Sequence, residues 1–220
     1  MKKYVSFSEL YLFNRDPKEW HRRYIDGIQF EPNDKMRLGS LFHKAVENKY
    51  YDWQHELVIN GLYKYQKPFA KALQKIQPYL LGEAEGSLIA KLPTGDDILC
   101  IFDRSSVSDR TVDDVKTYTN NEDGREMWNQ FIVDHHKQLT VYAVAWWLSK
   151  HQYLREMRIF ATNLSKGNVH VYKTTRGPAD IAIGLEWIIN TVQKIKKTGL
   201  WEKRLGSKDI SKLNNLKLFD

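Results

Sequence analysis

The hydrophobic pattern changes its period near residue 87, and this change limits what the chain can fold into. Before it, apolar residues recur every three or four positions, as in the stretch 37–53, which favours helices. After it, apolar and polar residues alternate in short segments separated by turn residues, which favours a meander of strands. The predicted strands cover residues 87–92, 98–107 and 111–118. We therefore expect a sheet covered by helices.

The flanking segments predict a mixed α/β fold, with a central mixed sheet flanked by helices and a helical region at the N-terminus. Ser6 and Glu9 have the spacing of a capping box, and Asp16-Pro17 reads as an N-cap followed by the first helical residue. The pattern predicts helices over 6–13, 16–27, 37–53, 57–81 with interruptions at Pro68 and Pro78, 128–150 and 178–197. It predicts two further strands over 158–164 and 169–174.

The balance of charge favours a polyanionic partner such as nucleic acid. The chain has 34 basic and 27 acidic residues, hence a net charge of +7. A single cysteine, Cys100, excludes a disulfide framework within the chain and a cysteine-based zinc or iron–sulfur site. The opening residues make a poor signal peptide, and no apolar run approaches the roughly 18 residues that span a bilayer. We expect a cytoplasmic protein with no membrane partner.

The segment TVDDVKTYT, residues 111–119, places two acids and a base on one predicted strand. Alternation puts Asp114 and Lys116 on one side and Asp113 on the other. Asp103, on the preceding strand, comes close to opposite Asp114 if the hairpin turns near residues 108–110. Two such carboxylates repel each other unless a cation lies between them, and Mg²⁺ prefers oxygen ligands. The alternative is a surface ladder of charge pairs, since D-x-K alone arises often by chance.

Two helical pairs accompany this motif. His43 and Glu47 lie four residues apart on one face of a predicted helix, and Gln138 and Tyr142 repeat that spacing near residue 140. A lone histidine of this kind is more often a core or surface residue than a ligand. The second pair also suits an ordinary amphipathic helix with a half-buried tyrosine.

Taken in chain order, these motifs resemble the PD-(D/E)XK nuclease superfamily, and within it the RecB-like exonuclease branch. The order is G-x-x-x-H from Gly39 to His43, then Asp103, then D-x-K at residues 114–116, then Q-x-x-x-Y at residues 138–142. The opening SFSELYLFNRDPKEWHRRY also resembles the start of that branch. The resemblance covers roughly residues 6–175, and the ordered set is more specific than any single motif.

The resemblance implies a set of site residues. The metal ligands would be His43, Asp103 and Asp114, with the backbone carbonyl of Val115. Lys116 would be the catalytic lysine, and Gln138 and Tyr142 would support the site; Glu85 lies where some members place an additional acid. The metal would be Mg²⁺, or Mn²⁺ because a histidine ligand is softer than oxygen.

The sequence departs from the branch at two places. The branch often has a glycine three residues before the first catalytic aspartate, and this chain has Cys100 there; the departure concerns the local backbone and not the ligand. Asp16-Pro17 replaces a Cys-Pro step, so the iron–sulfur cluster of some members is excluded. The two ends of the chain would instead close by packing, with Trp20, Trp187 and Trp201 as candidates.

The function implied is that of a metal-dependent DNA exonuclease acting on single- or double-stranded ends, in recombination, repair or phage DNA metabolism. One nuclease domain would span 1–220, with a helical part at 1–84, a catalytic core at 85–198 and a basic tail at 199–220. The sequence lacks a GxxxxGK[ST] motif, so a helicase or recombinase would be a separate partner. The candidate phosphate contacts are Arg22, Arg23, Lys35 and Arg37. A solvated basic face is an equally good interpretation of that cluster.

Three alternatives stay open. The first is a structure-selective or sequence-specific endonuclease on the same fold. The second is a nucleic-acid-binding subunit without catalysis, although every expected catalytic position holds the expected residue. The third is a basic α/β interaction domain in which the motifs match by accident.

Overall fold

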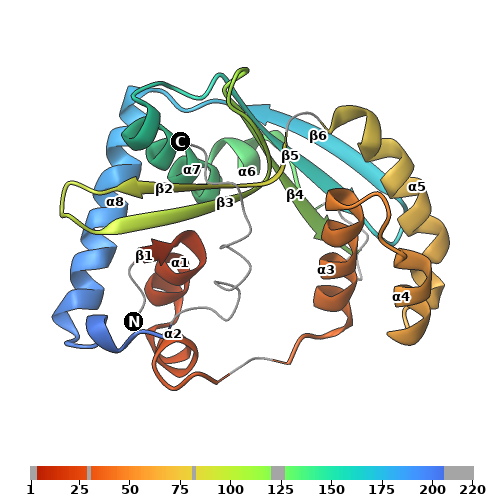
Figure 1. Cartoon of the computed structure of the whole chain (residues 1–220), viewed down its shortest axis with the longest axis horizontal. Helices are drawn as coiled ribbons and strands as arrows, with labels where there is room; N and C mark the ends of the chain where they lie inside the picture. The colour runs from red at the N-terminus through yellow and green to blue at the C-terminus, as the bar shows by residue number, and fades with distance from the viewer. Residues whose placement is uncertain (1–3, 29–30, 81–82, 120–126, 206–220) are drawn as a thin grey trace.

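A mixed six-stranded sheet forms the centre of the molecule (Figure 1). The computed structural model describes residues 4–28, 31–80, 83–119 and 127–205, without the side chains of 83–85. The strands are β1 (Tyr4–Ser6), β2 (Glu83–Lys91), β3 (Asp97–Ser106), β4 (Thr111–Tyr118), β5 (Glu156–Asn163) and β6 (Asn168–Thr174). They lie in the order β1-β3-β4-β5-β6, and β2 pairs with β3. The predicted α/β class with a central mixed sheet is confirmed.

The meander β2-β3-β4 is antiparallel, as its turns predicted, and so is the pair β5-β6. The pairs β1-β3 and β4-β5 are parallel. Along one edge, β3 changes its partner: it pairs with β1 at Asp97–Leu99 and with β4 at Arg104–Ser106. Residues 100–103 lie between these two ladders, so the sheet forks at that point.

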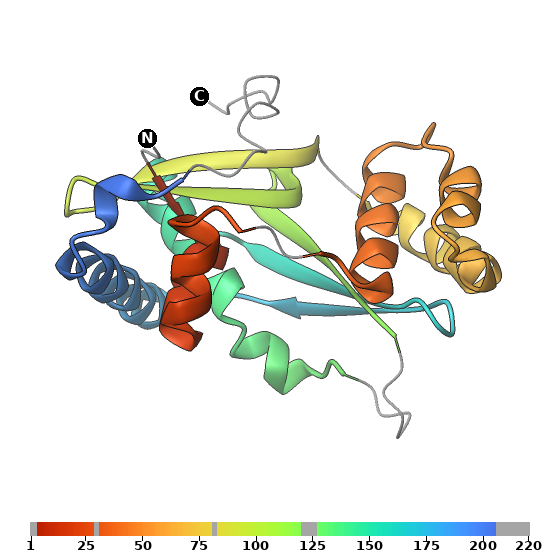
Figure 2. The ribbon, with the colours of Figure 1, turned by 90° about the horizontal axis from the view of Figure 1, so that it is seen from below.

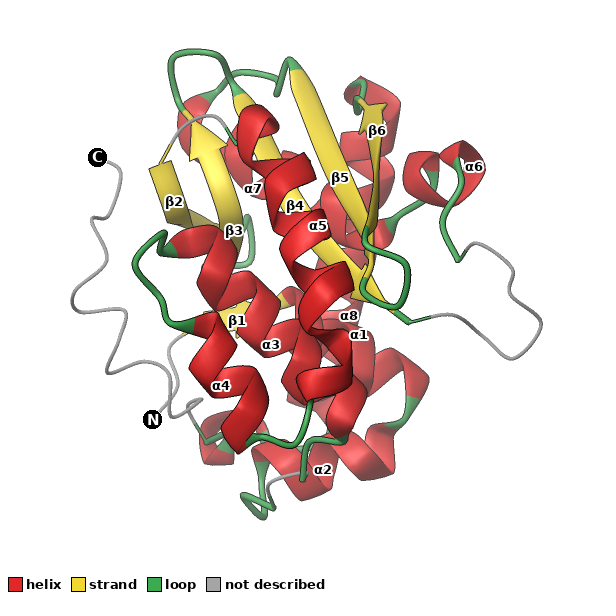
Figure 3. Ribbon diagram, turned by 90° about the vertical axis from the view of Figure 1, so that its right-hand side faces the viewer, coloured by secondary structure: helices red, strands yellow, loops and turns green. Residues whose placement is uncertain are grey.

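Helices cover both faces of the sheet. Figure 3 shows α3 (Asp34–Glu47), α4 (Trp53–Ile59) and α5 (Gln66–Ile76) in front of it, with α7 (Lys137–Lys150) and α8 (Pro178–Lys197) behind. The remaining elements are α1 (Phe7–Arg15), α2 (Pro17–Tyr24), α6 (Gln130–Asp134) and the short 3₁₀ turns η1 (Tyr63–Tyr65), η2 (Gln77–Tyr79) and η3 (Trp201–Lys203). Helices α1 and α2 lie at the far end from α3, α4 and α5 (Figure 2).

Each helix layer has its own apolar core. Val112, Leu139 and Ile188 belong to the core under α7 and α8. Val115 belongs to the core under α3, α4 and α5. Burying a large apolar side chain stabilises the fold by about 1.5–3 kcal/mol, so β4 is held from both faces.

Side-chain caps fix where α3 and α4 begin. The helix predicted over 37–53 corresponds to α3, which begins at Asp34 and already ends at Glu47. The Asn33 side chain accepts a hydrogen bond from the Met36 N–H at 3.0 Å, and the Asp52 side chain accepts one from the His55 N–H at 3.1 Å. Such caps satisfy N–H groups at a helix start, so α3 begins at residue 34 and α4 at residue 53, and residues 48–52 between them are not helical although a helix was predicted there.

Other boundaries differ in similar ways. The helix predicted over 128–150 is divided into α6 and α7, and Asn129 caps α6. The three-residue strand β1 was not predicted. Helix α8 has the predicted bounds, 178–197, and its Asp180 carboxylate accepts a hydrogen bond from the Gly177 N–H at 2.9 Å.

The two ends of the described chain meet through an ion pair. Glu9 Oε1 lies 3.1 Å from Arg204 Nη1, and both side chains are buried. The Leu205 N–H donates to the Tyr24 carbonyl at 2.7 Å. The Arg204 guanidinium lies over the Trp201 ring, and its central carbon is 3.5 Å from the ring centroid. Residues 199–205 therefore belong to the packed fold, and the rest of the predicted tail, 206–220, lies outside the described residues. None of the described helices combines the length and the apolar character that crossing a membrane requires.

Candidate active site

The fork between β3 and β4 is closed by side chains. The Val115 N–H on β4 donates to Asp103 Oδ2 on β3. The Ile101 carbonyl accepts a hydrogen bond at 2.7 Å from the Tyr142 hydroxyl on α7. Both bonds satisfy backbone groups that strand pairing would otherwise use. They also hold Asp103 and Tyr142 at the point where the two strands part.

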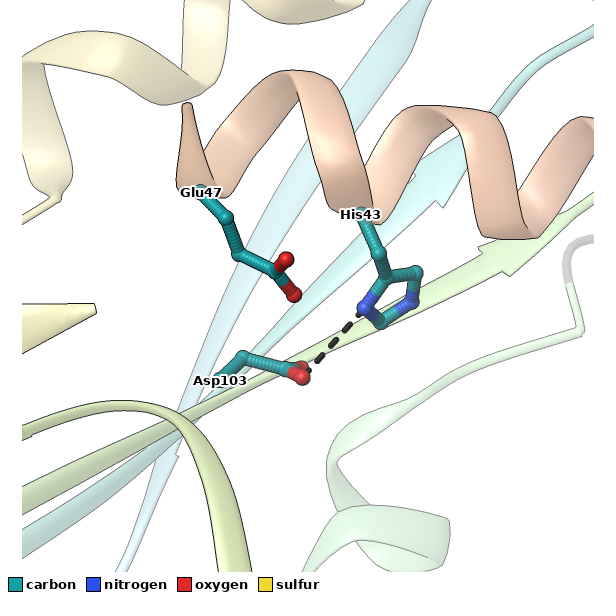
Figure 4. A group of neighbouring side chains, drawn as sticks. All are labelled: His43, Glu47 and Asp103. Carbon is teal, nitrogen blue, oxygen red and sulfur yellow. Dashed lines mark hydrogen bonds and ion pairs between the residues drawn. The ribbon is translucent and has the colours of Figure 1, made fainter. Parts of the chain in front are cut away.

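On the α3 side of the fork, His43 and Glu47 point toward Asp103 (Figure 4). His43 Nδ1 lies 3.3 Å from Asp103 Oδ1. One ligand atom from each of the three residues lies within 4.8 Å of the others. Helix α3 reaches this position because Gly39 has no side chain: a Cβ there would lie 2.6 Å from Thr117 Oγ1 on β4.

On the α7 side, Asp114 and Lys116 form an ion pair of 2.6 Å between Oδ2 and Nζ. The Asp114 side chain is only 3% exposed, whereas that of Lys116 is 26% exposed. Tyr142 lies 3.4 Å from Asp114 Oδ1, and Gln138 donates to the Tyr142 hydroxyl at 2.6 Å. The D-x-K and Q-x-x-x-Y motifs, separated by more than 20 residues, therefore share one hydrogen-bonded cluster.

The environment shifts the pKa values of Asp103 and Asp114 in opposite directions. Burial raises the pKa of Asp103, but the bonds from His43 and the Val115 N–H and the charge of Lys116 outweigh it and leave that pKa below its ordinary value. Burial raises the pKa of Asp114, and the charge of Asp103 adds to this although Lys116 opposes it. Asp114 would thus gain most from a nearby cation, which favours the ionised carboxylate.

The neighbouring side chains respond to the same charges. Burial lowers the pKa of His43, but its bond to Asp103 and the charges of Asp103 and Asp114 more than offset it, so the net pKa is raised. Burial raises the pKa of Tyr142 well above its ordinary value, and the two aspartates add to that rise. The tyrosine therefore serves as a neutral hydrogen-bond donor and acceptor at neutral pH.

Asp113 lies beside Asp114 in sequence but has another role. Its two carboxylate oxygens accept bonds of 2.7 Å from Nε and Nη2 of Arg158 on β5. Both side chains are buried. Because successive side chains of a strand point to opposite faces, Asp113 forms a structural ion pair with Arg158, whereas Asp114 lies at the fork.

The donor set fits a divalent cation. Two carboxylates and one imidazole converge in His43, Glu47 and Asp103, and such a mixed set suits Mn²⁺ as well as Mg²⁺. Asp114 is absent from that 4.8 Å group, and its carboxylate is held instead by Lys116. The described contact of Val115 is its N–H to Asp103, and a role for its carbonyl stays a prediction.

Sequence reasoning did not assign Glu47 to the site. The signal available was its position four residues after His43, on the same helical face. Glu85 lies on β2, but its side chain is outside the described set, so its role as an additional acid stays a prediction.

The four predicted phosphate contacts lie on α2 and α3. Arg22 and Arg23 both pair with Glu19, and Arg37 pairs with Asp34, all within helices. Lys35 lines a pocket of about 230 Å³ beside Thr117 at the end of β4. Three of the four charges are therefore partly compensated by a carboxylate.

Comparison with known proteins shows the fold. No protein-family profile and no curated protein matches the chain. The crystal structure of a candidate exonuclease from Eubacterium rectale is similar over 89% of this chain and 80% of that chain, with a TM-score of 0.65 and 12% sequence identity. The crystal structure of SSO0001 is matched over 83% of this chain and 84% of that chain, with a TM-score of 0.38 and 14% identity. At this identity, the first likeness establishes a shared fold.

Proposed function

We propose that the chain is a divalent-metal-dependent DNA exonuclease of the RecB-like branch of the PD-(D/E)XK superfamily. The observation that carries the proposal is the meeting of two groups at the fork: His43, Glu47 and Asp103 on one side, Asp114 and Lys116 on the other. Asp103 belongs to the first group, and it accepts a hydrogen bond from the backbone N–H of Val115, which lies between the two residues of the second group. The shared fold with a candidate exonuclease supports the same function.

The residues divide the chemistry among them. His43, Glu47 and Asp103 would hold the metal, with Asp114 on the other side of the fork. A bound divalent cation supplies charge stabilisation to a phosphate oxygen and lowers the pKa of a bound water. Lys116, which is partly exposed, would orient the attacking water and stabilise negative charge on the phosphate. Gln138 and Tyr142 would keep Asp114 and the β3 backbone in place.

Cleavage assays with purified protein test the proposal. Linear and closed-circular DNA, single- and double-stranded, are incubated with Mg²⁺, Mn²⁺ or EDTA. Lys116→Ala is compared with Lys173→Ala, which removes a lysine from an ion pair with Glu156. We expect loss of linear DNA only, dependent on metal, and a decrease of roughly 100-fold or more for Lys116→Ala alone.

The other outcomes identify the alternatives. Cutting of closed circles would assign an endonuclease on the same fold. DNA binding without cleavage in any metal would assign a non-catalytic binding subunit, and an assay with added helicase or recombinase would then test for a missing partner. Equal loss of activity in both lysine variants would remove Lys116 from the proposed role.

A further inference from the structure

A row of lysines lies on the outer helix α5 and the turn before it. Between Glu56 and Glu83 the chain has four basic residues and no acidic one. These four are Lys64, Lys67, Lys71 and Lys75, all exposed. Because residues four apart share a helical face, the three lysines of α5 form one row, and Lys64 on η1 extends it.

Neutral groups contact three of these side chains, so their charge is not cancelled. Lys71 Nζ donates to the Lys166 carbonyl at 3.4 Å, and Lys75 Nζ donates to Asn168 Oδ1 at 3.0 Å. Lys64 lies over the Tyr65 ring. Within the described parts of the chain, no carboxylate pairs with any of the four. Lys166, exposed on the turn between β5 and β6, adds a fifth charge.

The packing of α5 fixes the row relative to the candidate site. The Phe69 ring lies 5.1 Å from that of Phe42, the neighbour of His43 on α3, and 5.0 Å from the Trp53 ring. The turn between β5 and β6 also touches α5, since a Cβ on Gly167 would lie 2.6 Å from the Pro68 carbonyl. Figure 3 shows α5 beside α3 over the sheet. With helix axes about 8–10 Å apart, the row lies roughly 20 Å from His43.

We infer that this lysine row, with Lys166, is a second contact for the phosphate backbone of DNA, on the part of the substrate outside the candidate site. The inference rests on the proposed function, because it takes DNA as the substrate. The row repeats every four residues, about 6 Å, without an acid between. Such a row suits a partner whose charge repeats as regularly, which a phosphate backbone does. The roughly 20 Å to the site corresponds to about six base pairs.

The test compares two triple variants with equal loss of charge. The first is Lys67→Gln/Lys71→Gln/Lys75→Gln. The control removes three exposed lysines from α8 and the segment after it: Lys194→Gln/Lys197→Gln/Lys203→Gln. Fluorescence anisotropy measures the Kd of a labelled 20-base-pair DNA in EDTA at several salt concentrations. Circular dichroism confirms that both variants fold.

The salt dependence gives the decisive number. Each lost phosphate contact lowers the slope of log K against log salt by about 0.7–0.9, so the row variant is expected to lose about 2–3 in slope. The control is expected to lose less than a third of that. Equal slopes for the two variants would overturn the inference, because net charge alone would then explain the binding. Unchanged DNA binding by the row variant would also overturn it, and would direct the row to another anion such as an acidic protein.

DNA length separates this inference from the proposed function. A hairpin with a stem of four base pairs is too short to span both the site and the row, so the ratio of the Kd of the row variant to that of wild type is expected to be smaller for it than for the 20-base-pair DNA. Binding in EDTA needs no catalysis. A chain that binds long DNA through the row but never cleaves it would sustain the inference and refute the proposed function. Cleavage of DNA by wild type, together with unimpaired DNA binding by the row variant, would sustain the proposed function and refute the inference.

Discussion

Asp103 on β3 is bonded through its side chain to the backbone N–H of Val115 on β4, at the point where the two strands separate. Its other carboxylate oxygen faces His43 at 3.3 Å. One side chain thus connects the group on α3 with the strand that carries Asp114 and Lys116. The candidate site is built into the fork of the sheet, and its candidate ligand Asp103 is held in place by the fold itself.

Replacing Glu47 with Gln is expected to weaken metal binding. The change keeps the size of the side chain but replaces a charged carboxylate by a neutral amide at one of three ligand positions that lie within 4.8 Å of one another. We expect the Kd for Mn²⁺, measured by isothermal titration calorimetry without DNA, to rise at least tenfold. Glu186→Gln, the same change on an exposed position of α8, is the control. An unchanged Kd would exclude Glu47 as a ligand.

Replacing Tyr142 with Phe is expected to destabilise the fold by about 0.5–1.5 kcal/mol, because the partly buried hydrogen bond from its hydroxyl to the Ile101 carbonyl is lost. The hydroxyl also lies within reach of Asp114 and accepts from Gln138, so its loss is expected to lower cleavage as well. Urea unfolding gives the free energy. Tyr50→Phe, at an 83% exposed residue, is expected to stay within about 0.5 kcal/mol of wild type. Equal stability of the Tyr142→Phe and Tyr50→Phe variants would show that the bond from Tyr142 to the Ile101 carbonyl does not stabilise the fold.

Strong local periodicity made much of the fold predictable. The observed bounds of α8 and β4 are the predicted ones, because the hydrophobic pattern of each element is regular along its whole length and stops at both ends. Short elements lack that signal: β1 has three residues and depends on pairing with β3, nearly 100 residues away. The starts of α3 and α4 depend on single capping side chains, Asn33 and Asp52, which composition alone does not distinguish from helical surface residues.

The candidate site was predictable in part for a related reason. Order along the chain brought His43, Asp103, Asp114 and Lys116 into one hypothesis, and the structure places them around one fork. Predicting that Glu47 lies in the site would have required knowing that α3 approaches β4 at Gly39, and this is a tertiary contact. The basic residues were harder still. Arg22 and Arg23 pair with Glu19 inside one helix, and their spacing in the sequence predicts these pairs. The position of the α5 lysines relative to the site depends on tertiary packing, which their spacing does not predict.

Removing Arg158 is expected to affect stability more than chemistry. Arg158→Met leaves the buried Asp113 carboxylate without its two bonds, and loss of one partner of a buried pair costs about 3–5 kcal/mol. Burial already raises the pKa of Asp113 although Arg158 opposes it. The double variant Asp113→Leu/Arg158→Met removes the unpaired charge and is expected to recover part of the loss. Urea unfolding of the single and double variants checks this, and a double variant less stable than Arg158→Met would contradict it.

The stability of the fold is expected to fall in mild acid because of His136, the residue before α7. Burial lowers its pKa to about 4, and the charges of Lys116 and Arg176 add to the effect. The folded pKa lies below the unfolded value of 6.5, so the unfolded state takes up a proton first as the pH falls. The contribution of the neutral imidazole is therefore present above pH 6.5 and lost progressively toward pH 4. After allowance for solvent screening of a partly exposed ring, it amounts to about 1–2 kcal/mol.

Two measurements check the assignment to His136. Urea unfolding between pH 4 and pH 7 is expected to show a flatter pH dependence for His136→Gln than for wild type, while His55→Gln, at an exposed position, keeps the wild-type slope. NMR titration of the ring is expected to show a higher pKa in Lys116→Ala, because one of the charges that oppose protonation is gone. Equal slopes in the two histidine variants would assign the acid sensitivity to another group, and an unshifted His136 pKa would show that Lys116 does not act on it.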